Sequence, residues 1–359
     1  LAAGGLRVQA DLTREHLIAM AANMTRKMRV ASLRVDGAKA GIARDPAAPG
    51  KAAALARFLS AIRPYIEQRY SVGPDLNLRM EELEAAGRGL GLASVKMAIA
   101  RAQGITIPEL VTRMQLLEAV LPGGQTLGWL RGGYGVGAAV LAVLPWLGLA
   151  PREARVAVQG FGAVARSALA VLAAAQVRVT AIADASHALV ATGETGLPVP
   201  ALLALPGNGL PPAGPGMRAA VREAILETPC DCLVPAAVEH AIDDDAWPRL
   251  AARAVVPGAN LAVTAAAAAG LASRGVLVLP DFLTGCGGSL SMEGLFGPAA
   301  RPEPQAVLDH VCRRMTALVE RVLTESRQEG RPPTQVALDW CRQPVAPAGG
   351  PPYGPLPAG

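Results

Sequence analysis

A glycine-rich turn placed directly after a short apolar run most constrains the fold of this chain. Residues Val156 to Gln159 are mostly apolar and β-branched, as in a buried parallel strand, and the turn GFGAVA follows without a gap at 160–165. The apolar run 168–175 predicts a helix, and Val177 to Ala183 predicts a second strand. Strand, glycine turn, helix and strand in this order predict a nucleotide-binding βαβ unit.

Each position of the turn has its own physical task. Gly160 permits a tight turn, Gly162 lets the backbone approach a pyrophosphate, and Ala165 keeps helix and strand close. The start of the helix offers unpaired N–H groups to the anion. Asp184 ends the second strand about 20 residues further on, where a carboxylate binds the adenosine ribose and repels a 2′-phosphate. The pattern favours NAD over NADP; an ordinary glycine-rich turn is the alternative.

Length and composition predict a two-domain α/β protein. The 359 residues are enough for two cores of ordinary size, and 51% of them are hydrophobic. Strand-like runs alternate with helical patterns in the second half, which predicts a doubly wound parallel sheet. We expect an N-terminal α/β substrate-binding and oligomerisation domain at 1–128 and a Rossmann-type NAD-binding domain at 129–317. Helices at about 318–342 are expected to pack back on the first domain, before a mobile Pro/Gly tail at 343–359.

Charge and cysteine usage argue against several classes of function. Lys plus Arg exceeds Asp plus Glu by 34 − 29 = 5 without runs of like charge, so nucleic-acid binding is not indicated. The five cysteines lack ligand spacing, so we expect no metal site and a reducing, cytoplasmic location. The uncharged runs 132–151 and 254–273 contain proline and are expected to be buried, not to span a membrane. Because the chain begins at Leu1, we expect further residues before it.

Two lysines and one aspartate are the candidates for acid–base chemistry. Lys27 lies near the apolar side of a helix capped by Thr13, and Lys39 lies in the turn DGAKAG. A lysine whose pKa is lowered by burial or by a nearby cation is a usable general base at neutral pH. Asp75 is presented by the turn GPDLN. Each lysine could instead be a solvated surface charge, and Asp75 a turn or helix cap.

Taken together, these segments resemble the glutamate/leucine/phenylalanine/valine dehydrogenase family. The matches occur in order between residue 2 and about residue 295: AAGGLR, MTRKM, GAKAG, GPDLN, GYGV, VQGFGAV, CDCLVPAA, GAN and RGVLVLPDF. The resemblance implies oxidative deamination of an L-amino acid to its 2-oxo acid and ammonia, with hydride passing to NAD. It also implies a homo-oligomer, a hexamer or an octamer, and a substrate cleft between the two domains.

The resemblance also assigns roles to residues. Lys27 corresponds to the lysine that binds the substrate α-carboxylate, Lys39 to the catalytic lysine that activates water, and Asp75 to its acid–base partner. A second register would give the role of Asp75 to Glu82. The other substrate positions implied are Ala3, Gly4, Gly5 and Met292. The cofactor positions implied are Gly160, Phe161, Gly162, Ala163, Val164, Asp184, Ala236 and Asn260.

Two apolar positions bear on the substrate. Glutamate-specific members of the family have lysine where Ala3 stands and serine where Met292 stands. A carboxylate buried here without a partner would cost several kcal/mol, whereas an apolar side chain would gain from burial. We therefore predict a hydrophobic amino acid of the leucine, valine or phenylalanine type.

Two other functions stay open. Glutamate would be the substrate if Arg7 or Arg34 replaced the lost lysine. Alternatively, the chain is a catalytically weak or inactive regulatory subunit, which could form a hetero-oligomer with a catalytic paralogue. The second alternative is favoured by Gly132, where the family has threonine, and by Gly285, where it has asparagine.

Overall fold

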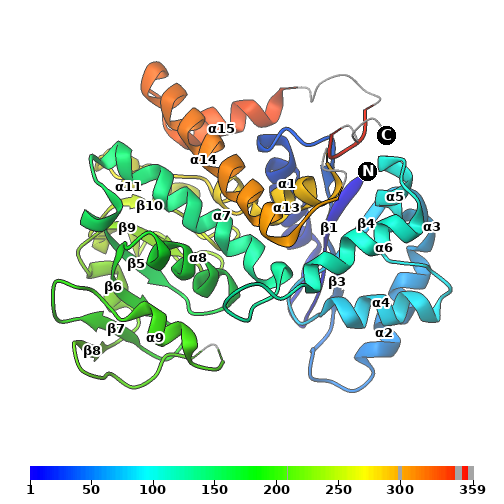
Figure 1. Cartoon of the computed structure of the whole chain (residues 1–359), viewed down its shortest axis with the longest axis horizontal. Coiled ribbons are helices and arrows are strands. Elements are labelled where there is room, and N and C mark those ends of the chain that lie inside the picture. The colour runs from blue at the N-terminus through cyan, green and yellow to red at the C-terminus, as the bar shows by residue number, and fades with distance from the viewer. Residues whose placement is uncertain (208, 298–300, 344–349, 355–359) are drawn as a thin grey trace. The chain divides into compact units, whose positions relative to one another are not determined.

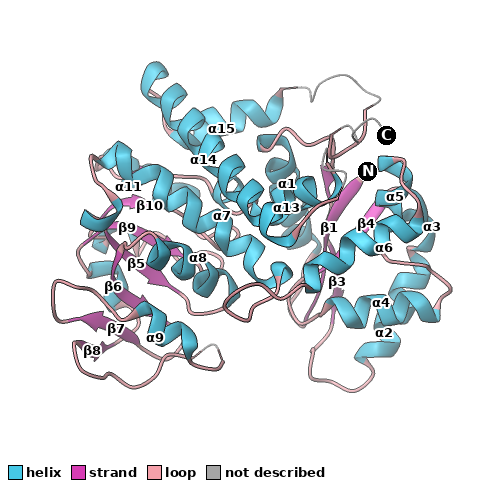
Figure 2. Ribbon diagram, in the orientation of Figure 1, coloured by secondary structure: helices cyan, strands magenta, loops and turns pink. Residues whose placement is uncertain are grey.

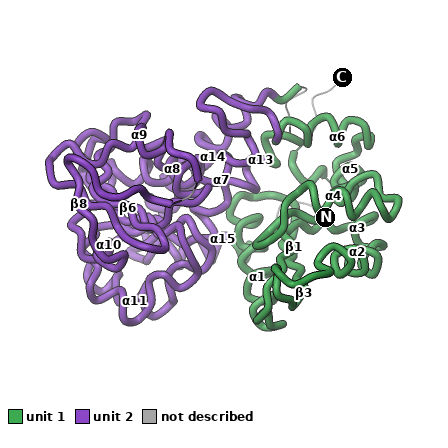
Figure 3. The backbone as a smooth tube through the Cα atoms, turned by 90° about the horizontal axis from the view of Figure 1, so that it is seen from below, with its two compact units in different colours: residues 1–117, 292–302, 341–359 green, residues 118–291, 303–340 purple. Residues whose placement is uncertain are grey.

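The computed structural model describes residues 1–207, 209–297, 301–343 and 350–354, and its chain divides into two compact units (Figure 3). Unit 1 comprises residues 1–117, 292–302 and 341–359, and unit 2 comprises residues 118–291 and 303–340. Each unit has a sheet of its own, drawn in magenta in Figure 2. The two-domain α/β architecture expected from the sequence is confirmed.

A four-stranded parallel sheet forms the centre of unit 1. Its central strand β1 (Ala2–Gln9) pairs with β2 (Asp36–Gly37), β3 (Ala40–Ala43) and β4 (Tyr70–Pro74). The sequence predicted a turn at 36–41, but β2 and β3 are two short strands that flank Lys39. The helices of this unit are α1 (Arg14–Val30), α2 (Lys51–Ala61), α3 (Arg63–Gln68), α4 (Met80–Gly89), α5 (Met97–Gln103) and α6 (Ile107–Gln115), followed by the 3-10 helix η1 (Leu116–Glu118).

The two faces of this sheet have different roles. Because alternate residues of a strand point to opposite faces, Leu6 and Val8 enter the apolar core while Ala3, Gly5 and Arg7 face the other way. The core on the first face is completed by leucines of α2 and α4, Ile66 of α3 and Val72 of β4. Helix α1 covers the second face, which we call the polar face and define by Ala3, Gly5 and Arg7 of β1.

Unit 2 contains a seven-stranded sheet in the order β11-β10-β9-β5-β6-β7-β8. The strands β5 (Arg155–Gln159), β6 (Arg178–Ala183), β9 (Cys230–Pro235), β10 (Ala252–Val255) and β11 (Leu277–Val278) run parallel. Beyond β6, strand β7 (Ala188–Ala191) pairs antiparallel with both β6 and the edge strand β8 (Met217–Ala220). The chain leaves β5 in one direction toward β6 and returns on its other side as β9. The carboxyl end of β5 is therefore a topological switch point, where open α/β sheets bind ligands.

Small-residue helices pack beside this sheet. Helix α7 (Leu127–Val143) packs against α8 (Ala163–Ala174) and α14 (Pro304–Glu329), as Figure 1 shows. With the 3-10 helix η2 (Leu144–Leu147), α7 is long and apolar enough to cross a membrane, but 67% of its apolar window is buried inside the protein. The remaining helices are η3 (Pro151–Glu153), α9 (Val199–Ala204), α10 (Ala224–Glu227), η4 (Trp247–Arg249), α11 (Ala265–Ser273), α12 (Asp281–Thr284), α13 (Gly287–Phe296) and α15 (Pro333–Arg342).

The C-terminal part differs from the sequence-based expectation. Helix α14 buries Val311, Met315 and its other apolar positions in unit 2, and α15 belongs to unit 2 as far as Trp340, whereas its last residues from Cys341 onward belong to unit 1. The Trp340 Nε1 atom donates a 2.6 Å hydrogen bond to Glu325 of α14, which joins the two helices. Of the tail that was expected to be mobile, Tyr353 is only 3% exposed and packs in unit 1. Residues 344–349 and 355–359 lie outside the described part of the chain.

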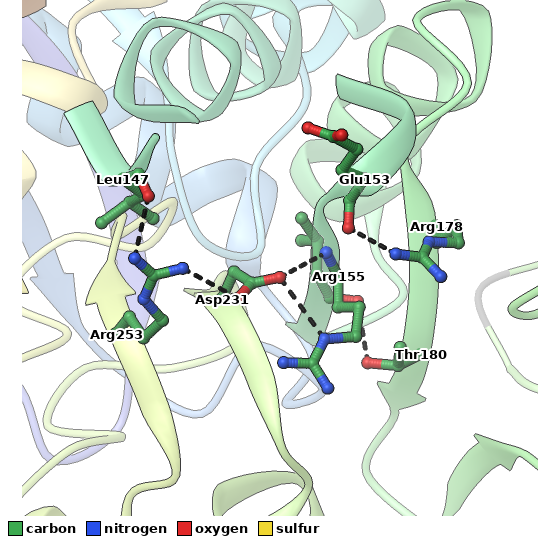
Figure 4. Close-up of polar contacts among 8 residues, drawn as sticks. Leu147, Glu153, Arg155, Arg178, Thr180, Asp231 and Arg253 are labelled. Carbon is green, nitrogen blue, oxygen red and sulfur yellow. Dashed lines mark hydrogen bonds and ion pairs between the residues drawn. The ribbon is translucent and has the colours of Figure 1, made fainter. Parts of the chain in front are cut away.

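A buried carboxylate joins three strands at the amino edge of the unit 2 sheet (Figure 4). Asp231 of β9 is 3% exposed. It accepts hydrogen bonds from the backbone N of Arg155 on β5 at 2.8 Å and from Nη1 of Arg253 on β10 at 3.3 Å. Burial raises the pKa of Asp231, but these hydrogen bonds and arginine charges outweigh burial and hold the pKa below its usual value.

Replacing Asp231 with asparagine is expected to lower the free energy of unfolding by about 1–3 kcal/mol, a range that allows for the half-exposed arginines. The folded-state pKa is depressed, so this stabilisation is present above the unfolded pKa of about 3.9 and is lost as the pH falls through the folded value. Urea unfolding of both proteins at pH 7, 5, 4 and 3 measures the difference. A difference that stays constant down to pH 3 would contradict the assignment to this carboxylate.

Candidate active site

Two glycines of β1 allow the catalytic candidates to approach each other. A Cβ on Gly4 would lie 1.6 Å from the carbonyl oxygen of Ala38, and a Cβ on Gly5 would lie 2.7 Å from the Cβ of Asp75. A side chain at either position would displace the segment that carries Lys39 or the turn that carries Asp75. The glycine pair is therefore the local reason that both segments lie against β1.

Lys39, Asp75 and Arg7 form one ion cluster in unit 1. The Lys39 Nζ atom lies 2.6 Å from Asp75 Oδ2, and Arg7 Nε donates a 2.8 Å hydrogen bond to the same oxygen. The side chains of Lys39 and Arg7 are only 4% and 6% exposed, and that of Asp75 is 20% exposed. Burial raises the pKa of Asp75, but the Lys39 ammonium and the Arg7 guanidinium outweigh burial and bring the pKa below its usual value. Asp75 is thus a carboxylate at neutral pH and can accept a proton.

Glu82, the alternative acid, has a different task. Its Oε1 atom lies 2.8 Å from Lys51 Nζ, and its Oε2 atom accepts a 2.8 Å hydrogen bond from the backbone N of Arg79, the N-cap residue of α4. Glu82 therefore fixes the start of α4, as acidic residues in the first helical turn commonly do. Of the two registers left open by the sequence, the one with Asp75 puts a carboxylate beside Lys39.

The other substrate positions lie in the same unit. Lys27 is 8% exposed on α1, the helix that covers the polar face. Ala3 is half-buried on the polar face, and Met292 is half-buried on α13. Arg34, offered by the sequence as a replacement basic residue, donates its backbone N to Pro352 of the C-terminal segment.

Sequence reasoning missed one basic residue of this unit, Lys96. Residues 90–96 separate α4 from α5. Gly91 has a φ of +75°, a left-handed conformation that ends the helical run, and the sequence signal for it was the glycine-rich GRGLG. Lys96 is 8% exposed, and its ammonium lies 3.7 Å from the position of a Cβ on Gly73 of β4.

The nucleotide turn of unit 2 has the geometry that its glycines predicted. Gly160 has a φ of +116°, and a Cβ there would lie 2.7 Å from the carbonyl oxygen of Ala236 at the end of β9. Gly162 has an ordinary φ of −82°, and a Cβ on it would meet nothing within 4 Å. Gly162 is the N-cap residue of α8 and contributes no side-chain cap, so the first amides of α8 can bind an anion. These features fit a dinucleotide pyrophosphate.

The remaining cofactor positions surround this turn. Phe161 is 2% exposed, so only its backbone could reach a ligand, while Ala163 and Val164 open α8. The side chain of Val164 would lie 3.2 Å from a Cβ on Gly258, which places it beside the segment that leads to Asn260. Gly160, Ala236 and Asn260 thus follow the carboxyl ends of β5, β9 and β10, the edge where such sheets bind nucleotides.

Asp184 is more deeply engaged than the sequence suggested. Its Oδ2 atom accepts a hydrogen bond from the backbone N of Leu210 at 2.7 Å, and its Oδ1 atom accepts from the backbone N of Ser186 and His187 at 2.7 and 3.0 Å. Burial raises the pKa of Asp184, but these hydrogen bonds outweigh burial, so the pKa lies well below its usual value. Asp184 therefore places a permanent negative charge at the end of β6 and also holds two loops together.

Comparison with known proteins places the chain in a family. Residues 123–346 match the Glutamate/Leucine/Phenylalanine/Valine dehydrogenase model, and residues 1–87 match the Glu/Leu/Phe/Val dehydrogenase dimerisation domain. The chain belongs to this family. The family resemblance inferred from the sequence is thus confirmed.

Several relatives are glutamate dehydrogenases. The glutamate dehydrogenase of Thermotoga maritima is 31% identical over 80% of this chain and 67% of its own length. The NADP-specific glutamate dehydrogenase A1 of Halobacterium salinarum is 30% identical over 79% of this chain and 66% of its own length. The hetero-hexameric glutamate dehydrogenase from Thermus thermophilus, in a Leu bound form, superimposes with a TM-score of 0.71 at 25% identity, over 95% of this chain and 79% of that one. The chain spans about two thirds of the length of these curated relatives.

Proposed function

We propose that this chain is a nicotinamide-dependent dehydrogenase that deaminates an L-amino acid to its 2-oxo acid and ammonia. The observation that carries the proposal is the buried contact of 2.6 Å between Lys39 Nζ and Asp75 Oδ2. A lysine and a carboxylate in contact form an acid–base pair that can move a proton between substrate and water.

In the proposed reaction, three residues of unit 1 act on the substrate. Lys27 binds the α-carboxylate of the amino acid. Lys39 orients the attacking water and stabilises the tetrahedral adduct, and Asp75 accepts and returns the proton. A bound nicotinamide would supply the acceptor for the hydride on the substrate Cα. The glycine turn at Gly160 and the first amides of α8 would hold its pyrophosphate.

We propose L-glutamate as the substrate, in place of the hydrophobic amino acid that Ala3 and Met292 suggested. The names of the relatives support glutamate. Ala3 lacks the lysine that glutamate-specific members have at this position, but Arg7, a basic residue of the same strand, also lies on the polar face.

The experiment that tests this function is reduction of NAD or NADP by the purified protein with a panel of L-amino acids at alkaline pH. We expect turnover with L-glutamate and much slower turnover with leucine, valine and phenylalanine. Faster turnover of leucine or phenylalanine than of glutamate would support a hydrophobic substrate and contradict glutamate. The absence of turnover with every amino acid, despite nucleotide binding, would contradict both proposals of an active enzyme.

Replacing Asp184 with asparagine is expected to reduce discrimination against NADP about 10-fold, because the variant loses a charge that repels a 2′-phosphate. Relatives include NADP-specific enzymes, so NAD stays a proposal for this chain. The kcat/KM ratio for NAD and NADP measures the preference, and asparagine keeps an acceptor oxygen for part of the loop contacts. A thermal melt controls for those contacts. If the wild-type protein prefers NADP, the assignment to NAD is wrong.

A second candidate function is a regulatory subunit with weak activity, assembled with a catalytic paralogue. Gly132 and Gly285 favour it, since both lack side chains that the family pattern has there. The Thermus thermophilus relative is described as hetero-hexameric, and residues 1–87 match a dimerisation domain. We propose a homo-oligomer in the cytoplasm, with the hetero-oligomer as the alternative. Light scattering of the purified chain, alone and together with a catalytic homologue, separates the two assemblies.

A further inference from the structure

A cavity lies at the amino edge of the unit 2 sheet, away from the nucleotide turn. Its volume is about 610 Å³, a usual size for a small-molecule site, and residues at the start of β10, before β11 and in the last turns of α14 form its walls. Strands β5, β9, β10 and β11 run parallel, so the cavity and Gly160 lie at opposite ends of these strands. The cavity is therefore separate from the proposed cofactor site.

The charged side chains that line this cavity in the described part of the chain are three arginines, Arg253, Arg274 and Arg327. Arg274 donates to three backbone carbonyls, and the Arg327 guanidinium lies 4.2 Å from the ring centroid of Trp146. Among the described residues, neither arginine is paired with a negative charge. Arg253 contacts Asp231, but this carboxylate is shared with a second arginine on β5 (Figure 4). The lining of the cavity is thus positively charged.

The protein already holds two of these guanidiniums in place. Arg253 donates a 2.8 Å hydrogen bond to the carbonyl oxygen of Leu147, and Arg274 donates a 3.1 Å hydrogen bond to that of Leu250. Both leucines line the cavity. A guanidinium has five N–H donors, and Arg253 and Arg274 direct at most two and three of theirs to protein atoms. Donors therefore remain for an anion, and little side-chain freedom would be lost when it binds.

A second, more apolar cavity of about 660 Å³ adjoins the first, and the segment 275–277 lines both. The alanines of α11, among them Ala269 and Ala272, form one of its walls, and Pro332 and Pro333 at the start of α15 form another. An anion held by the arginines could extend an apolar group over this surface and gain from its burial.

We propose that the two cavities form one binding site for a phosphate monoester that carries an apolar group. The phosphate binds the three arginines, and the apolar group lies along α11. A phosphate monoester fits this lining better than a single carboxylate does, because it has more negative charge and three terminal oxygens for several guanidiniums. The concave shape favours a small molecule over an acidic protein surface. Because this site lies apart from the nucleotide turn, the proposal does not depend on the proposed catalytic function.

The test is calorimetric titration of the full chain with hexyl phosphate, inorganic phosphate and hexan-1-ol. We expect hexyl phosphate to bind about 10-fold or more tightly than inorganic phosphate, because the hexyl group is buried, and hexan-1-ol to show no measurable binding. Arg327→Met should weaken binding of hexyl phosphate by about 10-fold, since charge-assisted hydrogen bonds are lost. Arg327→Lys keeps the charge and should recover part of this loss.

Arg321→Met is the matched control for Arg327→Met. Arg321 also lies on α14 and stacks on a tryptophan, with its guanidinium 4.3 Å from the ring centroid of Trp340, but it lines neither cavity. The affinity for hexyl phosphate should change less than about 2-fold in this variant. If Arg327→Met does not fold, Arg327→Gln takes its place in the same comparison.

Ala269→Gln tests where the apolar group lies. Ala269 is exposed in the second cavity, so a longer polar side chain there should weaken binding of hexyl phosphate about 5-fold and leave that of inorganic phosphate within about 2-fold. The proposal is overturned if the wild type does not bind hexyl phosphate, if hexan-1-ol binds equally well, or if Arg327→Met and Arg321→Met have equal affinities. Loss of hexyl phosphate binding at saturating NAD would place the phosphate at the nucleotide turn and also overturn it.

Discussion

Replacing Lys39 with methionine is expected to lower kcat for the amino-acid substrate by about 1,000-fold or more. General acid–base catalysis contributes about 10²–10⁴ in rate, and the variant also loses the charge that stabilises the tetrahedral adduct. Methionine fills the buried site, where the lysine side chain is 4% exposed, without leaving a large cavity. The main loss should therefore occur in kcat, measured by NADH or NADPH formation. The thermal midpoint should also fall, because Asp75 loses one of its two cationic partners and keeps only Arg7.

The pH dependence of the same variant gives a second readout. The Lys39 ammonium is the largest influence that lowers the pKa of Asp75, so its removal should raise that pKa. The acidic limb of the residual kcat/KM profile should then move to higher pH. Lys51→Met is the control, because it removes a lysine at 2.8 Å from the carboxylate of Glu82, which caps α4 and does not belong to the ion cluster of Lys39, Asp75 and Arg7. A Lys39→Met enzyme that keeps more than about one tenth of wild-type kcat would exclude Lys39 from the chemistry.

Replacing Gly160 with alanine is expected to destabilise unit 2 by roughly 3–5 kcal/mol and to abolish nucleotide binding. The φ of +116° is unfavourable for alanine, and the added Cβ would lie 2.7 Å from the backbone oxygen of Ala236, which has no freedom to rotate away. The turn and the end of β9 would have to separate. Urea unfolding and titration with NAD, followed by protein fluorescence, measure the two losses.

Gly162→Ala is the matched comparison for Gly160→Ala. Its Cβ would meet nothing within 4 Å and its φ is −82°, so the free energy of unfolding should change by less than about 0.5 kcal/mol. The same Cβ would occupy space next to the first amides of α8, so the Kd for NAD should rise by about 10-fold. Equal losses of stability in the two variants would contradict this assignment, in which Gly160 is needed for the backbone turn and Gly162 for the approach of the ligand.

The sequence alone determined the fold class, the family and the position of the nucleotide turn. These features depend on local patterns: an apolar run before GFGAVA, a helical run after it, and glycines where the backbone needs an unusual φ or a close neighbour. Helix α1 and its Thr13 cap were predictable for the same reason, since the cap contacts a residue only three positions away. The roles of Lys27, Lys39 and Asp75 came from the family resemblance and remain proposals.

Only the tertiary structure decided which groups meet across long stretches of sequence. Sequence periodicity could not choose between Asp75 and Glu82 as the acid. In the structure Asp75 contacts Lys39, whereas Glu82 accepts a hydrogen bond from the N-cap residue of α4. Periodicity also could not show that Asp184 holds the loop at Leu210 or that α14 packs on α7. It also gave no sign that the Lys96 ammonium lies beside Gly73 of β4. In each case the deciding contact joins residues distant in the chain, and its energy depends on burial and charge that local sequence does not carry.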